Sequence, residues 1–139
     1  MKLIFLIHVF CCWFMTGVIS LVQILVYPNF QIIGVSPFKK FHEFHLQRIT
    51  WIVAPVMVLE LLTATWIAYE KSNSLTLINL GSVVVLWMLT GIINVPAHNK
   101  LDVHDEISLR KLSFKNWPRT VLWSARTIGL FWFILSHEF

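Results

Sequence analysis

The residues best suited to chemistry in this chain begin with the segment HEFHLQR, which leads into a long apolar stretch. His42, His45 and Arg48 follow one another there at steps of three. Side chains three apart in a helix lie on one face. Imidazole can transfer protons or bind a metal, and guanidinium can stabilise an anionic oxygen. The segment therefore predicts a helix face that can carry acid–base or metal chemistry.

Three other apolar stretches carry polar side chains at helical spacing near one end. They are Gln23 and Tyr27 in the first, Asn94 and His98 in the third, and Asn116, Arg119, Trp123 and Arg126 in the fourth. Polar groups are expensive inside spanning helices, so each needs a reason. Alternating helices would bring all four sets to the same membrane face. We therefore expect a polar pocket there, with Trp51, Trp117 and Trp123 placed to wall a flat ligand.

The histidines raise the question of a metal. His42, His45 and His98, joined by a carboxylate such as Glu43 or Asp102, would suit zinc, copper or iron, and His104 is a further candidate. This spacing is less specific than an HExxH pattern. Interfacial histidines that cap helices or bind lipid headgroups are the alternative.

The arginines favour a different ligand. Arg48, Arg119 and Arg126 would make the pocket strongly cationic, and such a pocket prefers an anion. A phosphate, a carboxylated substrate or a lipid headgroup would fit.

Glu60 lies fifteen residues after His45, roughly 22 Å further along a helix at 1.5 Å per residue. We expect it to face the bundle interior deep in the membrane, without a cationic partner and largely protonated. Its expected neighbours are Cys11, Cys12, Thr16 and Ser82. It would hydrogen-bond a neighbouring helix, or serve as a proton relay or ligand anchor. The two adjacent cysteines are expected to be small, packed side chains rather than a disulfide.

Composition identifies the elements that must position these residues. The chain has 139 residues, of which 57% are hydrophobic and only 13% charged, and its mean hydropathy is +0.71. These values exclude an ordinary soluble domain. Helices of about 20 apolar residues span a bilayer, and the first three apolar runs meet that length. The fourth run is short unless Arg119 and Arg126 lie at or near the interface. We predict an all-α, integral membrane four-helix bundle of up-down topology, one domain over 1–139, with helices at about 3–27, 38–69, 75–98 and 117–136.

The first apolar run, which follows Lys2, could instead be a secretory signal, but it is longer than a typical signal core. Cations gather in the connections after the first and third helices. The positive-inside rule therefore predicts cytoplasmic long loops and external termini in the inner membrane. The pI of 9.3 follows mostly from this bias, so we expect no nucleic-acid partner.

Two stretches, GIINVPAHNKL and NWPRTVLWSAR, resemble the signature of the anthrone oxygenase-like proteins, which are small four-helix membrane proteins. The whole chain is similar to a group of bacterial integral membrane proteins with FMTGVISLVQ, HEFHLQR, PVMVLE and NWPRT segments. Some anthrone oxygenase-like proteins oxidise polycyclic aromatic anthrones without an obvious organic cofactor. The positions that match the signature are Asn94, Pro96, Asn99, Trp117, Trp123 and Arg126.

The function predicted from these observations is a small membrane oxidoreductase for a lipophilic substrate. His45, His98, Arg48 and Arg126 would be the catalytic residues. His42, His45 and His98 would either hold a zinc, copper or iron ion as cofactor or act as acid–base groups without one. The ligand-binding residues would be Gln23, Tyr27, Glu60, Asn94, Asn116, Trp117, Arg119 and Trp123. The alternatives are a non-catalytic protein that binds a lipid or anion, and an accessory subunit of a membrane complex. One copy shows no internal repeat of the transporter kind, although a homo-oligomer could form a path.

Overall fold

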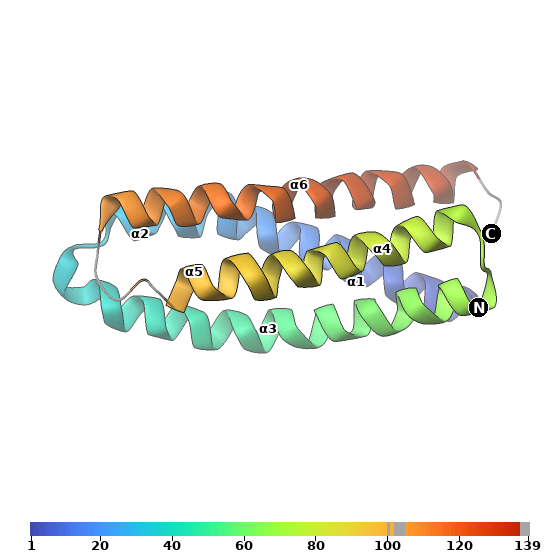
Figure 1. Cartoon of the computed structure of the whole chain (residues 1–139), viewed down its shortest axis with the longest axis horizontal. Coiled ribbons are helices and arrows are strands. Elements are labelled where there is room, and N and C mark those ends of the chain that lie inside the picture. The colour runs from blue at the N-terminus through green and yellow to red at the C-terminus, as the bar shows by residue number, and fades with distance from the viewer. Residues whose placement is uncertain (100, 102–104, 137–139) are drawn as a thin grey trace.

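The computed structural model describes residues 1–99, 101 and 105–136, and these residues form helices and no strand. The first rod consists of α1 (Lys2–Leu21), the π-helical segment η1 (Val22–Val26) and α2 (Tyr27–Ile32). The second is α3 (Val35–Glu70). The third consists of α4 (Ser74–Met88), the π-helical segment η2 (Leu89–Asn94) and α5 (Val95–Asn99), and the fourth is α6 (Glu106–Ser136). The predicted all-α four-helix architecture is confirmed (Figure 1).

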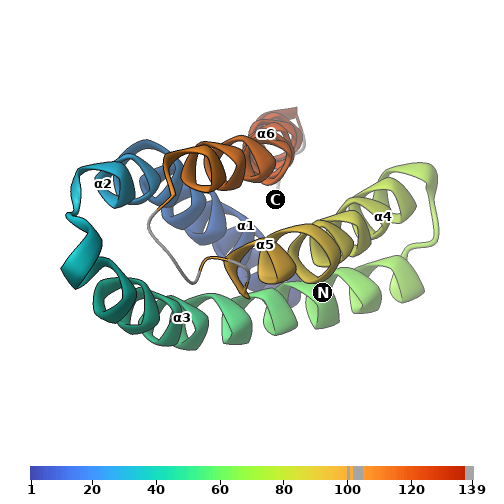
Figure 2. The ribbon, with the colours of Figure 1, turned by 60° about the vertical axis from the view of Figure 1, so that its left-hand side comes forward.

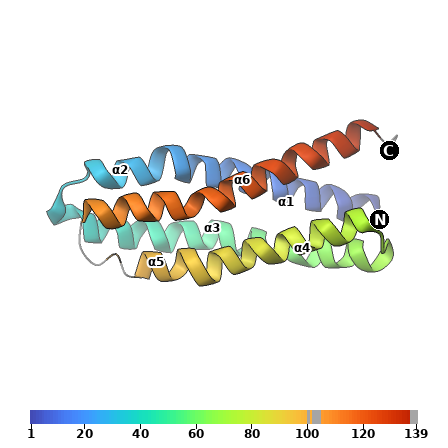
Figure 3. The same ribbon diagram turned by 45° about the horizontal axis from the view of Figure 1, so that its top comes forward.

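The rods pack in a ring that follows chain order. The first packs against α3 and α6, while α4 packs against α3 and, more lightly, against α6. Both termini and the α3–α4 turn lie at one end of the bundle (Figure 1). The α2–α3 turn, α5 and the start of α6 lie at the other, which we call the loop end, and a turned view shows the same order (Figure 3). Neighbouring rods are therefore antiparallel.

Three rods are long and apolar enough to cross a membrane: Lys2–Ile32, Val35–Glu70 and Ser74–Asn99. Large apolar side chains point outward along them, for example Ile24, Leu62 and Ile78, each more than 60% exposed. A soluble protein rarely exposes apolar surface on this scale. The fold is therefore that of a helical membrane protein.

The fourth helix is longer than predicted, because it begins at Glu106 rather than at residue 117. Asp105 caps it: its carboxylate accepts from the backbone N–H groups of Ile107 and Ser108. Leu109 and Leu112 then bury themselves in a cluster at the loop end. The sequence between the third and fourth apolar runs looked like a loop because its apolar residues are few and periodic rather than continuous.

The first helix also continues further than predicted. Pro28 does not end it, and the chain stays helical to Ile32. Proline lacks an N–H and crowds the carbonyl four residues earlier, which for Pro28 is Ile24 and for Pro96 is Ile92. Both carbonyls lie inside the π-helical segments η1 and η2. The wider π turn accommodates each proline without breaking the rod.

Candidate functional site

A cavity of about 230 Å³ lies inside the loop-end half of the bundle. Its apolar wall comes from α1, η1, α3 and α4, with Met15, Ile19, Val22, Val53, Met57 and Trp87 among the lining residues. Its polar groups come from η2, α5, α2, α3 and α6, with Thr90, Asn94, His98, Tyr27, His45 and Arg119. Mostly apolar walls with a few converging polar groups are typical of a site for a small organic molecule. Both π-helical segments border this cavity.

Tyr27, His98 and His42 form a hydrogen-bonded chain at the polar end. The Tyr27 hydroxyl lies 3.2 Å from His98 Nε2, and His98 Nδ1 lies 3.1 Å from His42 Nε2. A neutral imidazole has one donor and one acceptor nitrogen, so the chain has two directions. In one, Tyr27 donates to His98. In the other, His98 donates to Tyr27, whose O–H is then released for a ligand. Tyr27 can therefore donate or accept at the cavity.

Arg119 supplies the positive charge of the cavity. Its Nη1 donates to Asn116 Oδ1 (3.1 Å), and its guanidinium lies 5.4 Å from the ring centre of Trp123. Asn116 is itself fixed by donating to Gln23 Oε1 (2.9 Å). Gln23 in turn donates to the Ser113 hydroxyl. Gln23, Asn116 and Trp123 thus orient Arg119 instead of reaching the cavity themselves, although they were predicted to bind ligand.

Two buried polar atoms at the cavity have no hydrogen-bond partner within the described part of the chain: Arg119 Nε and Asn94 Oδ1. Arg119 is 7% exposed and Asn94 2%. Asn94 Nδ2 does have a partner, because it donates to the Leu89 carbonyl within η2 at 3.0 Å. No carboxylate among the described residues pairs with Arg119. Leaving buried polar atoms unpaired costs free energy. Arg126 Nε is also unpaired among the described residues, but Arg126 does not line the cavity, whereas Arg119 and Asn94 do.

The three-histidine metal site receives no support. Among residues 1–99, 101 and 105–136, no group of three or more His, Cys, Asp or Glu side chains is placed to hold a metal ion. His42 and His98 direct nitrogens at each other as hydrogen-bond partners. His45 lies edge-on to the Phe30 ring instead. Asp102 and His104, two of the proposed ligands, lie outside the described residues.

Three aromatic or cationic residues predicted at the pocket do not line it. Arg48 is exposed, with its guanidinium 5.3 Å over the Phe44 ring on the same helix. Trp51 is 76% exposed and Trp117 is 48% exposed. The helical spacing correctly placed them near the loop end, but their side chains point outward.

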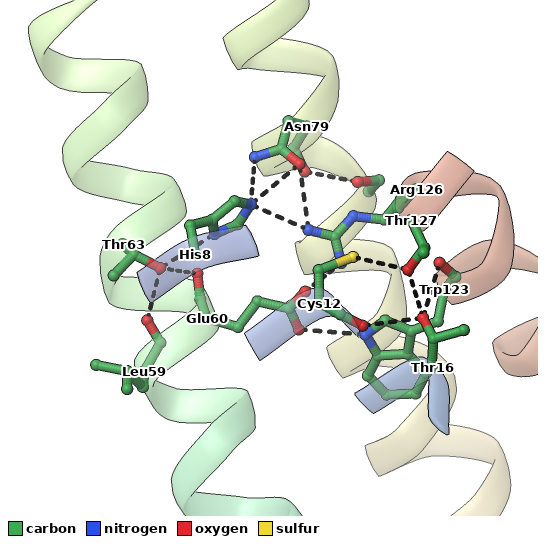
Figure 4. Close-up of polar contacts among 11 residues, drawn as sticks. His8, Cys12, Thr16, Leu59, Glu60, Thr63, Asn79, Trp123, Arg126 and Thr127 are labelled. Carbon is green, nitrogen blue, oxygen red and sulfur yellow. Dashed lines mark hydrogen bonds and ion pairs between the residues drawn. The ribbon is translucent and has the colours of Figure 1, made fainter. Parts of the chain in front are cut away.

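Glu60 and Arg126 correct two further predictions, because they form a buried ion pair away from the cavity (Figure 4). Arg126 Nη1 lies 2.5 Å from Glu60 Oε1, and Trp123 Nε1 donates to Glu60 Oε2 (3.2 Å). Glu60 therefore has a cationic partner, and Arg126 does not belong to the loop-end cluster. Of its expected neighbours, Cys11 and Cys12 do lie close enough to Glu60 for an electrostatic interaction. Cys12 and Thr16 also bond to Thr127 of α6. Both cysteines are buried and free.

His8 and Asn79 complete this network and were not predicted. The Thr63 hydroxyl donates to the Leu59 carbonyl, so it accepts from His8 Nδ1 at 3.0 Å. His8 Nε2 is then the acceptor for Asn79 Nδ2, also at 3.0 Å. Asn79 Oδ1 accepts from Arg126 Nη2. The sequence held one signal for this network: His8 is a polar residue inside the first apolar run, and Asn79 is one inside the third.

The network joins all four rods, and its charges balance: one carboxylate, one guanidinium and a neutral imidazole (Figure 4). Polar contacts that run between all four rods are suited to fixing how the helices align, and within the described residues only Arg126 Nε of this network has no partner. No family model, curated protein or solved structure matches the chain. The anthrone oxygenase-like resemblance therefore remains a prediction from the quoted motifs.

Proposed function

We propose that the chain is a membrane protein that binds a lipophilic molecule bearing an anionic or strongly accepting oxygen. The observation that carries the proposal is Arg119, a buried guanidinium at an apolar cavity with an unpaired Nε and no carboxylate partner among the described residues. An oxyanion would pair with Nε, and Tyr27 could donate to the same group. Asn94 Oδ1 would accept from a ligand hydroxyl.

The size of the cavity limits the ligand. Its volume of about 230 Å³ is below the ~300–1,000 Å³ of sites that enclose drug-sized molecules. The cavity therefore takes a small molecule, or the polar end of a longer amphiphile. A fatty-acid anion, a phenolate and the phosphate end of a lipid share the required chemistry.

Binding of dansylundecanoate, a fluorescent fatty-acid anion, tests this proposal in phosphatidylcholine vesicles that contain the purified protein. We expect saturable binding, and weaker binding of its neutral methyl ester. Arg119→Gln should weaken binding of the anion about ten- to hundredfold, the range expected for a hydrogen bond to a charged group. Arg48→Gln is the matched control, since Arg48 lies at the same end but is exposed.

Equal binding of anion and ester by the wild-type protein, or an unchanged affinity in a folded Arg119→Gln variant, would contradict the proposal. Arg119→Lys keeps the charge but loses the planar fork, so it should fall between the wild type and Arg119→Gln.

A second candidate is an acid–base enzyme of the kind that the resemblance implies. The Tyr27–His98–His42 chain favours it, because it can take a proton from a substrate carbon acid and pass it away from the cavity. For an anthrone, the lost proton comes from the carbon across the ring from the carbonyl. Arg119 would stabilise the resulting phenolate oxygen. Dioxygen would be the oxidant: one of its oxygen atoms would become the new carbonyl of the quinone, and the other would leave as water with the two hydrogens of that carbon.

Oxygen uptake with anthrone measures this candidate. Tyr27→Phe and His98→Gln should each lower the rate at least tenfold, and His98→Gln should do so while leaving dansylundecanoate binding within about threefold. Equal rates in the wild type and both variants would leave binding as the function.

We also propose a location. The loop-end cations and the positive-inside rule support the bacterial inner membrane, with the loop end in the cytoplasm and both termini outside.

A further inference from the structure

The cavity is closed toward the loop end of the bundle. Phe30, Phe38, Leu109 and Leu112 are each no more than 1% exposed and form a packed cluster there, together with Leu101. Tyr27, at the polar end of the cavity, belongs to the same cluster and is 2% exposed. Within the described residues, this cluster separates the polar groups of the cavity from the end of the bundle.

The cavity opens instead through its side, between α3 and the third rod. Thr50 and Ala54 of α3 line the cavity and are nevertheless exposed. Trp87 of α4 and Val95 of α5 line the opposite side and are 36% and 49% exposed. Residues that both line a cavity and reach the surface form its rim. We call the opening framed by these four residues the side window.

The packing of the third rod explains where the window begins and ends. On the side of the termini, α4 packs against α3, with Met57 and Leu86 buried in one cluster. On the loop-end side, the His42–His98 hydrogen bond joins α3 to α5. Between these contacts lies η2, which packs against α6. The view turned by 60° shows α5 and α4 running between α3 and α6 (Figure 2).

The depth of the window determines what it faces. Thr50 and Ala54 lie in the apolar run of α3, and Trp87 lies in the apolar run of α4. Neighbouring outward residues on both rods are apolar, such as Val58, Met88 and Ile92. At this depth the surroundings of a spanning helix are acyl chains rather than water.

We propose that the ligand enters sideways from the bilayer through this window, with its polar end advancing to Arg119 and its apolar tail remaining in the opening. The inference rests on the proposed binding function and deepens it: the ligand is a membrane-partitioned amphiphile with an oxyanion end, not a molecule taken from water. A tail left in the window also reconciles a cavity of about 230 Å³ with a longer ligand.

Stopped-flow association of dansylundecanoate with protein in phosphatidylcholine vesicles tests the route. Ala54→Trp places a large ring on the rim at an exposed position, so it should fold normally and slow association at least tenfold. Val58→Trp adds the same ring one turn away on the same helix, at an exposed position that does not line the cavity, and should leave the rate within twofold. Thr50→Trp is a second rim variant, and it should also slow association at least tenfold.

Association at the wild-type rate in both folded rim variants would overturn the side window. If Arg119→Gln still weakened binding in that case, the binding site would stand and only the route would be wrong. No saturable binding to the wild-type protein would overturn both the route and the proposed function. Equal slowing by Val58→Trp would also contradict the window, since the effect would then not belong to the rim.

Discussion

At the scale of single residues, the two buried arginines have opposite surroundings. Arg126 is neutralised by Glu60 and held further by Asn79. Arg119 is held by Asn116 and the face of Trp123, neither of which cancels its charge. Trp123 touches both systems, because its N–H donates to Glu60 while its ring lies against Arg119. The first arginine is thus suited to stabilising the bundle and the second to meeting a ligand.

The ion pair gives a prediction on stability. Glu60→Gln or Arg126→Gln leaves one buried charge without its partner and should lower the free energy of unfolding by about 3–5 kcal/mol. The double variant should lose less than the sum of the two, because it leaves no uncompensated charge. Unfolding in mixed micelles with increasing dodecyl sulfate, followed by circular dichroism, measures each value.

The exposed pair Glu106–Arg110, at 3.5 Å on α6, provides the control. Its side chains are more than 70% exposed, so Arg110→Gln should change the stability by less than about 1 kcal/mol. If the double variant lost as much unfolding free energy as the Glu60 and Arg126 variants lose together, the two charges would not depend on each other.

At the scale of elements, the two π-helical segments shape the site. Each wide turn contains the carbonyl that a proline crowds, and each borders the cavity. η1 carries Gln23, which orients Asn116, and η2 carries Asn94, whose amide satisfies the Leu89 carbonyl. If either segment were regular α-helix, the residues that follow it would be rotated about the helix axis relative to the residues that precede it. The prolines therefore influence the positions of Gln23 and Asn94, which precede Pro28 and Pro96 within the same rods.

Replacement of Pro96 tests this role. Pro96→Ala restores an N–H that can bond to the Ile92 carbonyl, so η2 should convert to α-helix and Asn94 should move out of register with the cavity. We expect slower hydrogen exchange of amides 89–96. Binding of dansylundecanoate should weaken at least tenfold, because Thr90, Asn94, Val95 and His98 form one stretch of the cavity wall and would rotate relative to one another. Pro55→Ala is the matched control, because Pro55 lies in regular α3 and does not line the cavity. Unchanged exchange and binding in Pro96→Ala would refute the connection between the proline and the site.

At the scale of the whole molecule, the bundle is divided along its length. The half near the termini holds the charge-balanced network around Glu60, and the loop-end half holds the cavity and the aromatic cluster that closes it. Outside, apolar side chains cover the rods at both depths. The four rods therefore enclose the network around Glu60, whereas the cavity reaches the surface at the side window. The two polar systems meet at Trp123.

The orientation of the bundle in the membrane is a prediction about the whole molecule. Single cysteines at Lys39, near the loop end, and at Lys71, in the α3–α4 turn, occupy exposed positions at opposite ends. In intact spheroplasts a membrane-impermeant maleimide should label Lys71→Cys and spare Lys39→Cys, which should react only after permeabilisation. The native cysteines are buried and give little background. The reverse pattern would place the loop end outside.

The sequence by itself determined the four helical rods, their alternating direction and the loop-end gathering of Tyr27, His42, His98 and Arg119, because length and helical spacing depend only on local order along the chain. Its fourth helix began too late, since the amphipathic start at Glu106 carries no continuous apolar run. Only the tertiary structure decided which polar groups meet. Spacing gives a residue's angle around its own helix, not the rotation of that helix against its neighbours. That rotation turns Arg48 and Trp117 outward, joins Arg126 to Glu60, and leaves Arg119 unpaired at the cavity.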